Sequence, residues 1–484
     1  MALDCRDHKQ VLHNQGKSHV TSFTSGKTLP YKLAESISEQ PVIPSPNLFS
    51  DFPDSESKGV RLPTVSECAA HLELLETFYV LRQRILRSAK MDSAMGVVPE
   101  RETKTGANND TKVLKDPKLW EKRQIKWSVF VEFAVVRFLV WRSTISRTHP
   151  ESGSDGRAGM VKEFFLPPVD VLIVWHALML NPRLFRAHCE AEPLYRMAMP
   201  WRKVDELIDG NTWGLALPDT AKANFESHTN LSEDLFAFLE AWPPVPKTDT
   251  AQPNGETPVA ALQVPRATAL TLDAKANPPS GPKFPTEGHP EIHRYIDQFK
   301  LASQTDLAVQ LRDAVIRQTS FIDKMNNHLW IRSPFASSTL RRGISRYEKF
   351  LELMRLHPRQ MFVPTLDIDL VWHTHQCQAF MYAKGTNKIV GRFINHDDSI
   401  EQKKLIDGSG VTSKMWRVRY GTEYRVCGCW DCEGLVSVLE SAEEEPREME
   451  NIVRKVAGQV MYHRAVEAAR RAGGKLPKFP MEVL

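Results

Sequence analysis

Regular hydrophobic patterning begins near residue 64, and most of the patterned segments after it have helical spacing. Thr64 and Glu67 have the spacing of a capping box, and apolar residues then recur every three or four positions. The same periodicity predicts further helices over 120–146, 291–330, 338–356 and 450–472. Alternating strand patterns are scarce, so we expect a mainly α fold.

Three segments lack this patterning. Residues 1–60 are rich in Ser, Pro, Gly and Lys, and we expect disorder there. Residues 92–113 contain Gly, Asn, Asp and Thr, which predict a loop, and 243–283 hold many prolines and few large apolar residues, which predict a linker. The linker divides the chain into a first helical half, 61–242, and a second, 284–435, followed by a basic helical tail, 436–484.

An internal repeat connects the two halves. FLPPVDVLIVWHALMLNPRLF aligns with FVPTLDIDLVWHTHQCQAF at an offset of 197 residues. The aligned polar and aromatic pairs are Asp170 with Asp367, Trp175 with Trp372, and His176 with His373. We therefore expect two related helical halves that pack on each other, because neither alone offers a large apolar core.

Positions shared by both copies favour structural roles. Asp170 and Asp367 stand just before an apolar helical run, which suits a helix N-cap. The two tryptophans fall on the apolar face and are expected in the core. His176 and His373 are either satisfied buried histidines, the more frequent case, or ligands.

The second copy differs from the first at two chemically important positions. Asp369 replaces Leu172, and His375 replaces Leu178. On a helix Asp369 and His373 share a face, whereas His373 and His375 lie about 200° apart and would not bind one ion. A metal-dependent hydrolase built on these three residues is therefore the weakest of the functional hypotheses.

An acidic cluster follows in GRFINHDDSIEQKK, with His396 beside it. Helical spacing would place Asp397 or Asp398 on the same face as Glu401, and mutual repulsion should raise the pKa of at least one carboxyl group. Such a group can act as a general base or bind a cation. The alternative is a solvated acidic first turn of a helix.

The sequence CGCWDC places Cys427, Cys429 and Cys432 within six residues. Three thiols at this spacing are typical of zinc ligands, but a structural zinc site needs a fourth, for which His373, His396 or His463 are candidates. Reduced cysteines that merely pack are the alternative.

Basic residues interleaved with aromatic ones suit an RNA backbone and stacked bases. Arg417, Arg419 and Arg425 alternate with aromatic residues in this way, and Arg470 and Arg471 belong to a basic run near the C-terminus; these five are the candidate RNA-binding residues. A solvated charged face is the alternative.

Composition adds limits. The net charge of +4 is too small to indicate nucleic-acid binding by itself, and no apolar run is long enough to span a membrane. Seven cysteines, most of them far apart, favour a reducing compartment, and we expect a cytoplasmic protein.

The motifs PPVDVLIVWHALMLNP, VPTLDIDLVWHTHQ, GRFINHDD and YGTEYRVCGCWDCEGL resemble the glycine-rich domain-containing protein-like family, in particular its fungal branch. The chain has no glycine-rich tail like that of the plant branch. The acidic DDxxE motif is similar to that of arginine-containing cyclodipeptide synthases. Those enzymes condense arginyl-tRNA with a second aminoacyl-tRNA to a diketopiperazine in secondary metabolism.

That resemblance implies a catalytic role for Asp397, Asp398 and Glu401, with Asp369, His373, His375 and His396 in support. It implies two aminoacyl-tRNAs as partners, tailoring enzymes of a biosynthetic pathway, and no required cofactor, because the aminoacyl ester already carries the activation. The alternative function is a non-catalytic interaction protein with a zinc-stabilised C-terminal module.

Overall fold

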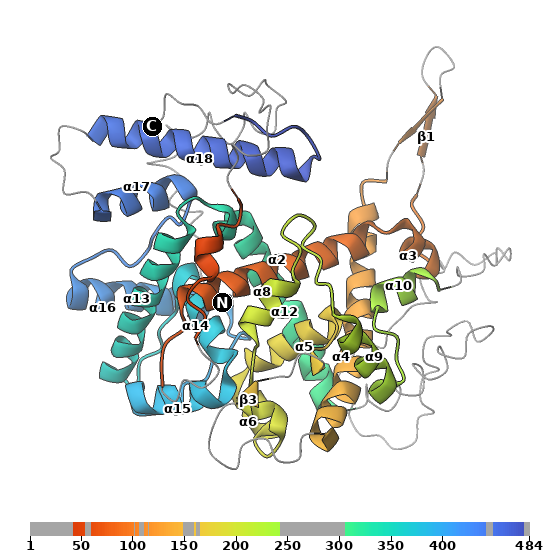
Figure 1. Ribbon diagram of the computed structural model, residues 1–484, viewed down its shortest axis with the longest axis horizontal. Coiled ribbons are helices and arrows are strands. Elements are labelled where there is room, and N and C mark those ends of the chain that lie inside the picture. Colours follow the sequence, from red (N-terminus) through yellow and green to blue (C-terminus); the bar gives the residue numbers. More distant parts are fainter. Residues whose placement is uncertain are drawn as a thin grey trace.

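The computed structural model describes residues 42–53, 60–100, 102–105, 111–114, 116–148, 159–160, 165–242, 305–441 and 449–478. These residues are mainly helical, as the patterning predicts (Figure 1). The predicted linker 243–283 lies outside the described residues, as do 1–41 and 54–59 of the N-terminal segment. Residues 42–53 are described, and Leu48 there is buried against the core.

The first half contains η3 (Pro46–Phe49), α2 (Val65–Arg87), α3 (Ala89–Ala94), α4 (Leu119–Thr148), α5 (Val169–Met179), α6 (Pro182–Cys189), α7 (Pro193–Arg196), α8 (Trp201–Leu207), α9 (Asp219–Thr229) and α10 (Leu235–Glu240). The second half and the tail contain α12 (Asp306–His328), η6 (Trp330–Arg332), α13 (Ala336–Leu356), α14 (Leu366–Gln376), α15 (Ala379–Val390), α16 (Gln402–Tyr420), α17 (Trp430–Ser441) and α18 (Met449–Arg471).

The strands are short. β1 (Glu102–Thr105) pairs with β2 (Thr111–Leu114) in an antiparallel hairpin, and β3 (Gly159–Met160) pairs with β4 (Met197–Ala198) in parallel. The hairpin occupies part of the segment 92–113, where the sequence predicts only a loop, so that prediction is wrong for the two strands.

Local signals account for several helix boundaries. The Thr64 side chain accepts a hydrogen bond from the Glu67 amide while the Glu67 carboxylate accepts one from the Thr64 amide, so the predicted capping box is confirmed. Helices α4, α13 and α18 agree with the predicted segments to within two residues. Of the predicted helix 291–330, residues 306–328 form α12, and 291–304 lie outside the described residues.

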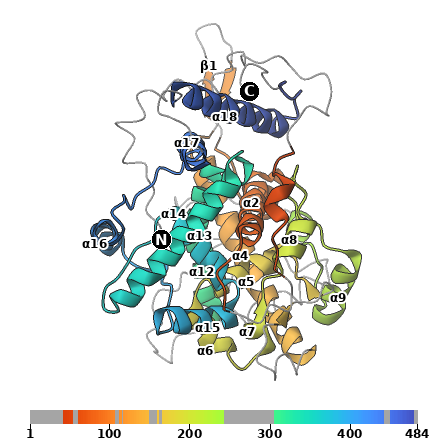
Figure 2. The same ribbon diagram turned by 60° about the vertical axis from the view of Figure 1, so that its left-hand side comes forward.

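One hydrophobic core includes residues of both halves. Helix α12 packs on α2, α4 and α5, and α14 packs on α2 and α13. Figures 1 and 2 show α2 in the middle of the molecule and α18 at the top of the molecule as drawn. The halves therefore pack together as expected. The internal repeat itself stays a prediction.

The expected N-cap roles of two aspartates are wrong. Neither Asp170 nor Asp367 caps its helix; each lies inside the first turn. The Arg137 Nε donates to Asp170 at 2.5 Å, and the Arg346 Nε donates to Asp367 at 2.5 Å. Each carboxylate therefore anchors its helix to the preceding long helix, because a buried guanidinium needs an ionised partner more than a helix end needs a cap.

Candidate functional site

Helix α14 carries the polar residues that the sequence singles out, and it is buried along its whole length. Asp369 and His373 are four residues apart and meet on one face, as their spacing predicts. His375 points elsewhere, where its Nδ1 lies 3.0 Å from the Tyr347 hydroxyl. His373 and His375 therefore have different neighbours, in agreement with their spacing of two residues on a helix.

A third residue completes a cluster with Asp369 and His373. His396, which follows α15 in an irregular segment, brings its Nε2 to 3.2 Å from the Nε2 of His373. The Asp369 Oδ1 lies 3.4 Å from the His373 Nε2 and 3.7 Å from the His396 Nε2. Three potential ligand atoms from two elements thus face one another in the interior.

The environment of the cluster fixes both imidazole rings. The Leu180 carbonyl, 3.0 Å away, can only accept a hydrogen bond, so His396 carries a proton on Nδ1 and directs its Nε2 towards the cluster. Phe321 packs against the His373 ring, with centroids 4.3 Å apart, and Trp372 meets His396 edge-on. A backbone carbonyl that orients a histidine in this way is typical of metal sites.

The Asp369 carboxylate is the least satisfied group in the cluster. It is fully buried, and neither of its oxygens has a hydrogen-bond partner of acceptable geometry; the Nδ1 of His373 has none either. Burial alone would raise the pKa of Asp369, but the neighbouring imidazoles outweigh burial and hold it below its usual range. Burial holds the pKa of His373 well below its usual value. The carboxylate and the two imidazoles are therefore buried together with few hydrogen-bond partners of acceptable geometry.

Its dimensions suit a small cation. For metal–ligand bonds of about 2.0–2.1 Å, tetrahedral coordination separates neighbouring ligand atoms by about 3.3–3.4 Å. The separations of 3.2, 3.4 and 3.7 Å lie close to that value. Two imidazoles and one carboxylate form a donor set used for Zn²⁺ and Fe²⁺, with further positions left for water or substrate.

A hollow of about 220 Å³ adjoins this cluster. Its lining includes Met354, Phe362, Trp372, Phe393, His396 and Asp397. A larger hollow of about 410 Å³ lies around Trp213 and Asp170, away from this cluster. We consider the smaller hollow the relevant one, because His396 belongs to both its wall and the cluster.

The acidic DDxxE residues do not share a helical face, and that prediction is wrong. Residues 397–401 are irregular, and α16 begins only at Gln402. Asp398 is buried and accepts hydrogen bonds from Arg317 Nε at 3.0 Å and Gln318 Nε2 at 3.1 Å. Because Arg317 and Gln318 of α12 already bond to this carboxylate, Asp398 attaches its segment to α12 rather than offering a free carboxylate for catalysis.

The other two acidic residues are exposed. Asp397 accepts from the amide and hydroxyl of Ser399 at 2.9 and 2.6 Å, and these bonds lower the pKa of Asp397, opposite to the expected rise. Glu401 lies 3.6 Å from Lys404 and faces solvent. Among the three, Asp397 alone lines the hollow.

The three cysteines of CGCWDC do come together. Their sulfur atoms all lie within 4.8 Å of one another, and the Cys432 amide donates to the Cys429 sulfur at 3.5 Å. Gly428 between them has φ +69°, and a side chain there would meet the Trp330 ring. The Trp330 Nε1 holds this turn by donating to the Gly428 carbonyl at 2.6 Å.

The suggested fourth ligands do not join this cysteine cluster. His373 and His396 belong to the cluster at Asp369, and His463 bonds within α18 to the Gln459 carbonyl at 2.9 Å. Three hydrogen-bonded thiols share protons, and these bonds lower the pKa of Cys427 to about 3. A metal here would find three protein ligands among the described residues.

The expected RNA-binding arginines do not form one basic surface. Arg417 and Arg419 on α16 pair with Glu423 and Glu352, and Arg471 on α18 pairs with Glu76 and Glu467. The two remaining candidates also have partners: Arg470 donates to the Ile43 carbonyl and Arg425 to Ser409. Figures 1 and 2 show α16 and α18 on separate parts of the molecule. Their charge is therefore divided and largely paired.

Sequence reasoning missed two connections. It named His396 without linking it to Asp369, and it gave no role to His71 of α2, whose Nε2 lies 2.9 Å from the Nε2 of His176. His71 stands 105 residues from His176 along the chain, and no local spacing rule joins them. The exchange of Leu172 for Asp369 between the copies was the one sequence signal for the first cluster.

No helix among the described residues is long and apolar enough to cross a membrane. No solved structure shows a significant match to this fold.

Comparisons of the sequence identify relatives for one part of the chain. The profile of the glycine-rich domain-containing protein-like family matches residues 282–385. Glycine-rich domain-containing protein 1 of Arabidopsis thaliana is 34% identical over 97 residues, which cover 18% of this chain and 12% of that protein. Glycine-rich domain-containing protein 2 of the same plant is 35% identical over 97 residues, with the same coverage.

The chain thus spans about an eighth of the length of these curated relatives. The matched segment carries Asp369, His373, His375 and Cys377 but ends before His396, the DDxxE residues and the cysteine cluster. The matches support the glycine-rich domain-containing protein-like family for residues 282–385, the segment that contains α12, α13 and the face of α14 with Asp369 and His373.

Proposed function

We propose that this protein is a metalloprotein with an interior metal centre at Asp369, His373 and His396. The observation that carries the proposal is the fully buried Asp369 carboxylate, which has no hydrogen-bond partner and faces two histidine Nε2 atoms at 3.4 and 3.7 Å. An ionised carboxylate buried without compensation is strongly unfavourable. A divalent cation held by Asp369, His373 and His396 would compensate this charge and would use the lone pairs of the two imidazoles in their neutral form.

The adjoining hollow gives such a centre access to a small substrate group. His396 belongs to its wall, and Asp397 keeps an ionised carboxylate at its rim. A metal with an open position there would polarise a carbonyl or activate a water molecule. We therefore favour a Lewis-acid reaction on a small polar substrate, in which Asp397 would bind a cationic part of that substrate.

Metal analysis of the purified full chain tests the proposal. We expect one tightly bound equivalent at this centre in the wild type, and its loss in His396→Ala. His375→Ala is the matched control, because it removes a buried histidine of the same helix that faces Tyr347. Equal metal content in the wild type and His396→Ala would reject the metal centre.

The second candidate function is the arginine-dependent cyclodipeptide synthase, and Asp397 at the rim of the hollow favours it. Asp397 is the acidic residue of the motif best placed to receive a guanidinium or an α-amine. Expression in a heterologous host should then yield an arginine-containing diketopiperazine detectable by mass spectrometry. Asp397→Asn should abolish the product, whereas Glu401→Gln, which alters an exposed residue outside the hollow, should not. Undiminished product in Asp397→Asn would exclude this role.

A zinc-stabilised C-terminal module is favoured by the mutual proximity of the three cysteine sulfur atoms. Zinc there would join the loop before α17 to the first turn of that helix. Cys429→Ser should then lower the unfolding temperature of the zinc-loaded protein and leave that of the chelated protein unchanged. An equal loss in both preparations would indicate packing alone.

A further inference from the structure

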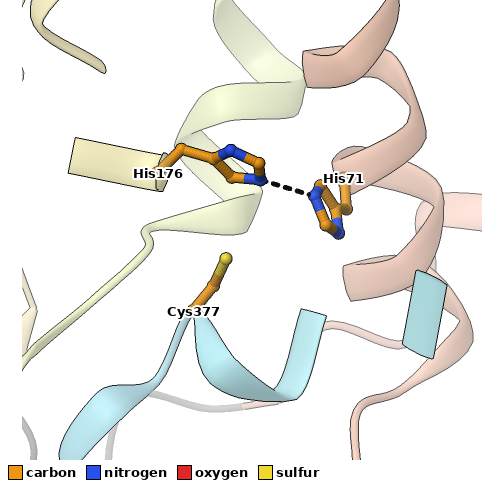
Figure 3. Close-up of side chains that lie close together, drawn as sticks. All are labelled: His71, His176 and Cys377. Carbon is orange, nitrogen blue, oxygen red and sulfur yellow. Dashed lines mark hydrogen bonds between the residues drawn. The ribbon is translucent and has the colours of Figure 1, made fainter. Parts of the chain in front are cut away.

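A second group of ligand-type side chains lies in the interior, beside the Asp369 centre. Figure 3 shows His71 from α2, His176 from α5 and Cys377 from the end of α14 turned towards one another. The ligand atoms of the three residues all lie within 4.8 Å of one another, and each residue is at most 1% exposed. Three elements from both halves of the chain therefore converge on one point.

The hydrogen bonds around His71 determine which of its nitrogens faces the cluster. The Thr374 hydroxyl donates its only proton to the Leu370 carbonyl at 2.8 Å, so its oxygen accepts from the His71 Nδ1 at 2.8 Å. The His71 Nε2 is then an unprotonated acceptor directed at His176, 2.9 Å away. This is the orientation that a metal-binding histidine needs.

The cluster is built from groups that gain little from one another in the absence of an ion. Burial holds the pKa of His71 well below its usual value, lowers the pKa of His176 to about 3 and raises the pKa of the Cys377 thiol. The two neutral imidazoles form one hydrogen bond with each other, and the neutral thiol of Cys377 takes no part in it. Apolar side chains would fill this interior volume at least as well.

We propose that His71, His176 and Cys377 form a second metal site, which binds a borderline-soft ion of the zinc class. Two imidazoles and a thiolate suit Zn²⁺, with a fourth position left for another ligand. Binding would release the thiol proton of Cys377 to solvent and would require the proton that His176 carries on Nε2 to move to its Nδ1, so that His71 and His176 are both neutral ligands through Nε2. This site would have two imidazoles and a thiolate as ligands, whereas the centre at Asp369 would have two imidazoles and a carboxylate. The second site is therefore the softer of the two.

The two sites share one face of α14. Asp369, His373 and Cys377 follow at intervals of four residues, so they form a single stripe along the helix. Cys377 lies about 6 Å beyond His373 along the helix axis, at 1.5 Å per residue. The second site therefore adjoins the proposed metal centre and goes beyond it, since its ligands are separate and either site can be occupied without the other.

Cobalt substitution distinguishes the sites, because a thiolate ligand adds a sulfur-to-cobalt charge-transfer band in the near ultraviolet. We would express the full chain in zinc-depleted medium with Co²⁺ and compare three proteins. Relative to the wild type, Cys377→Ser should lose the band intensity of one thiolate and one metal equivalent. Cys189→Ser is the matched control, because Cys189 is also a buried free cysteine and should change neither. The contribution of Cys427, Cys429 and Cys432 is common to all three proteins and cancels.

The same experiment separates the second site from the first. His396→Ala should lose the metal of the Asp369 centre and keep the full thiolate band. If Cys377→Ser does not fold, His71→Gln removes a ligand without touching a cysteine and should likewise reduce the band. The proposal of a second site would be overturned if folded Cys377→Ser or His71→Gln had the same charge-transfer band and the same metal content as the wild type. This holds whatever the result for His396→Ala.

Discussion

Helices α5 and α14 begin in the same way and then differ along the face that turns to the interior. Each holds an aspartate in its first turn that binds an arginine of the preceding long helix, Arg137 to Asp170 and Arg346 to Asp367. Each buries a tryptophan followed by a histidine.

The difference lies at two aligned positions of that face. Where α14 has Asp369 and Cys377, α5 has Leu172 and Leu180, so α5 offers one ligand-type side chain and α14 offers three. Leu180 takes part only through its backbone, whose carbonyl accepts from His396. The comparison teaches that the Arg–Asp pair and the buried tryptophan belong to the scaffold, whereas Asp369 and Cys377 of α14 are polar groups that an apolar interior does not need.

The largest expected effect concerns the scaffold. Arg137 and Asp170 are 0% and 1% exposed in their side chains, against 14% and 9% for Arg346 and Asp367. Asp170→Ala leaves a buried guanidinium without its carboxylate and should lower the free energy of unfolding by about 3–5 kcal/mol. Asp367→Ala should cost less, because water reaches its partner. Denaturant unfolding followed by circular dichroism measures both, and equal losses would remove this difference between the two pairs.

The contact between the halves predicts a pH effect. Glu132 of α4 lies 3.8 Å from Arg312 of α12, and burial, opposed by Arg312, raises the pKa of Glu132 to about 7. The folded state then keeps a proton that the unfolded chain releases near pH 4.5, so the free energy of unfolding falls as the pH rises from about 4.5 to 7. The decrease should amount to about 2–3 kcal/mol.

Glu132→Gln should abolish that decrease. Chemical unfolding at pH 4.5, 6 and 8 measures it, with Glu121→Gln, an exposed change on the same helix, as the control. An unchanged pH profile in Glu132→Gln would mean that Glu132 stays ionised in the folded protein.

Making α14 more like α5 tests the polar stripe. Asp369→Leu installs the residue that α5 has at the aligned position and removes a buried carboxylate without partners. In protein prepared without metal it should raise the free energy of unfolding by about 1–3 kcal/mol. In metal-loaded protein it should abolish binding at that centre and lower stability relative to the wild type. If Asp369→Leu changed the free energy of unfolding in the same direction in both preparations, that result would argue against a metal at Asp369.

The smallest effect concerns His375, the second polar exchange. His375→Leu installs the α5 residue and removes one hydrogen bond with the buried Tyr347 hydroxyl. We expect a loss of about 1 kcal/mol in the free energy of unfolding and unchanged metal content. Loss of metal would place His375 in the centre after all.

Much of the local structure follows from the sequence. The capping box at Thr64, the long helices and the burial of Trp175 and Trp372 were predictable, because spacing within one helix determines which side chains share a face. The same rule correctly placed Asp369 with His373 and kept His375 apart. It failed at Asp397 and Glu401, since their spacing has meaning only in a helix and that segment is irregular.

The amino-acid sequence by itself determined a mainly helical protein, the two motif helices and the polar character of one face of α14. Only the tertiary structure decided which residues meet that face: His396 from a later segment, His71 from α2 and His176 from α5. His373 and His396 are 23 positions apart, and His71 and His176 are 105 positions apart. Cys377 meets the second of these pairs from the other half of the chain. Helix periodicity acts over a few residues, whereas such contacts depend on how whole helices pack in the common core.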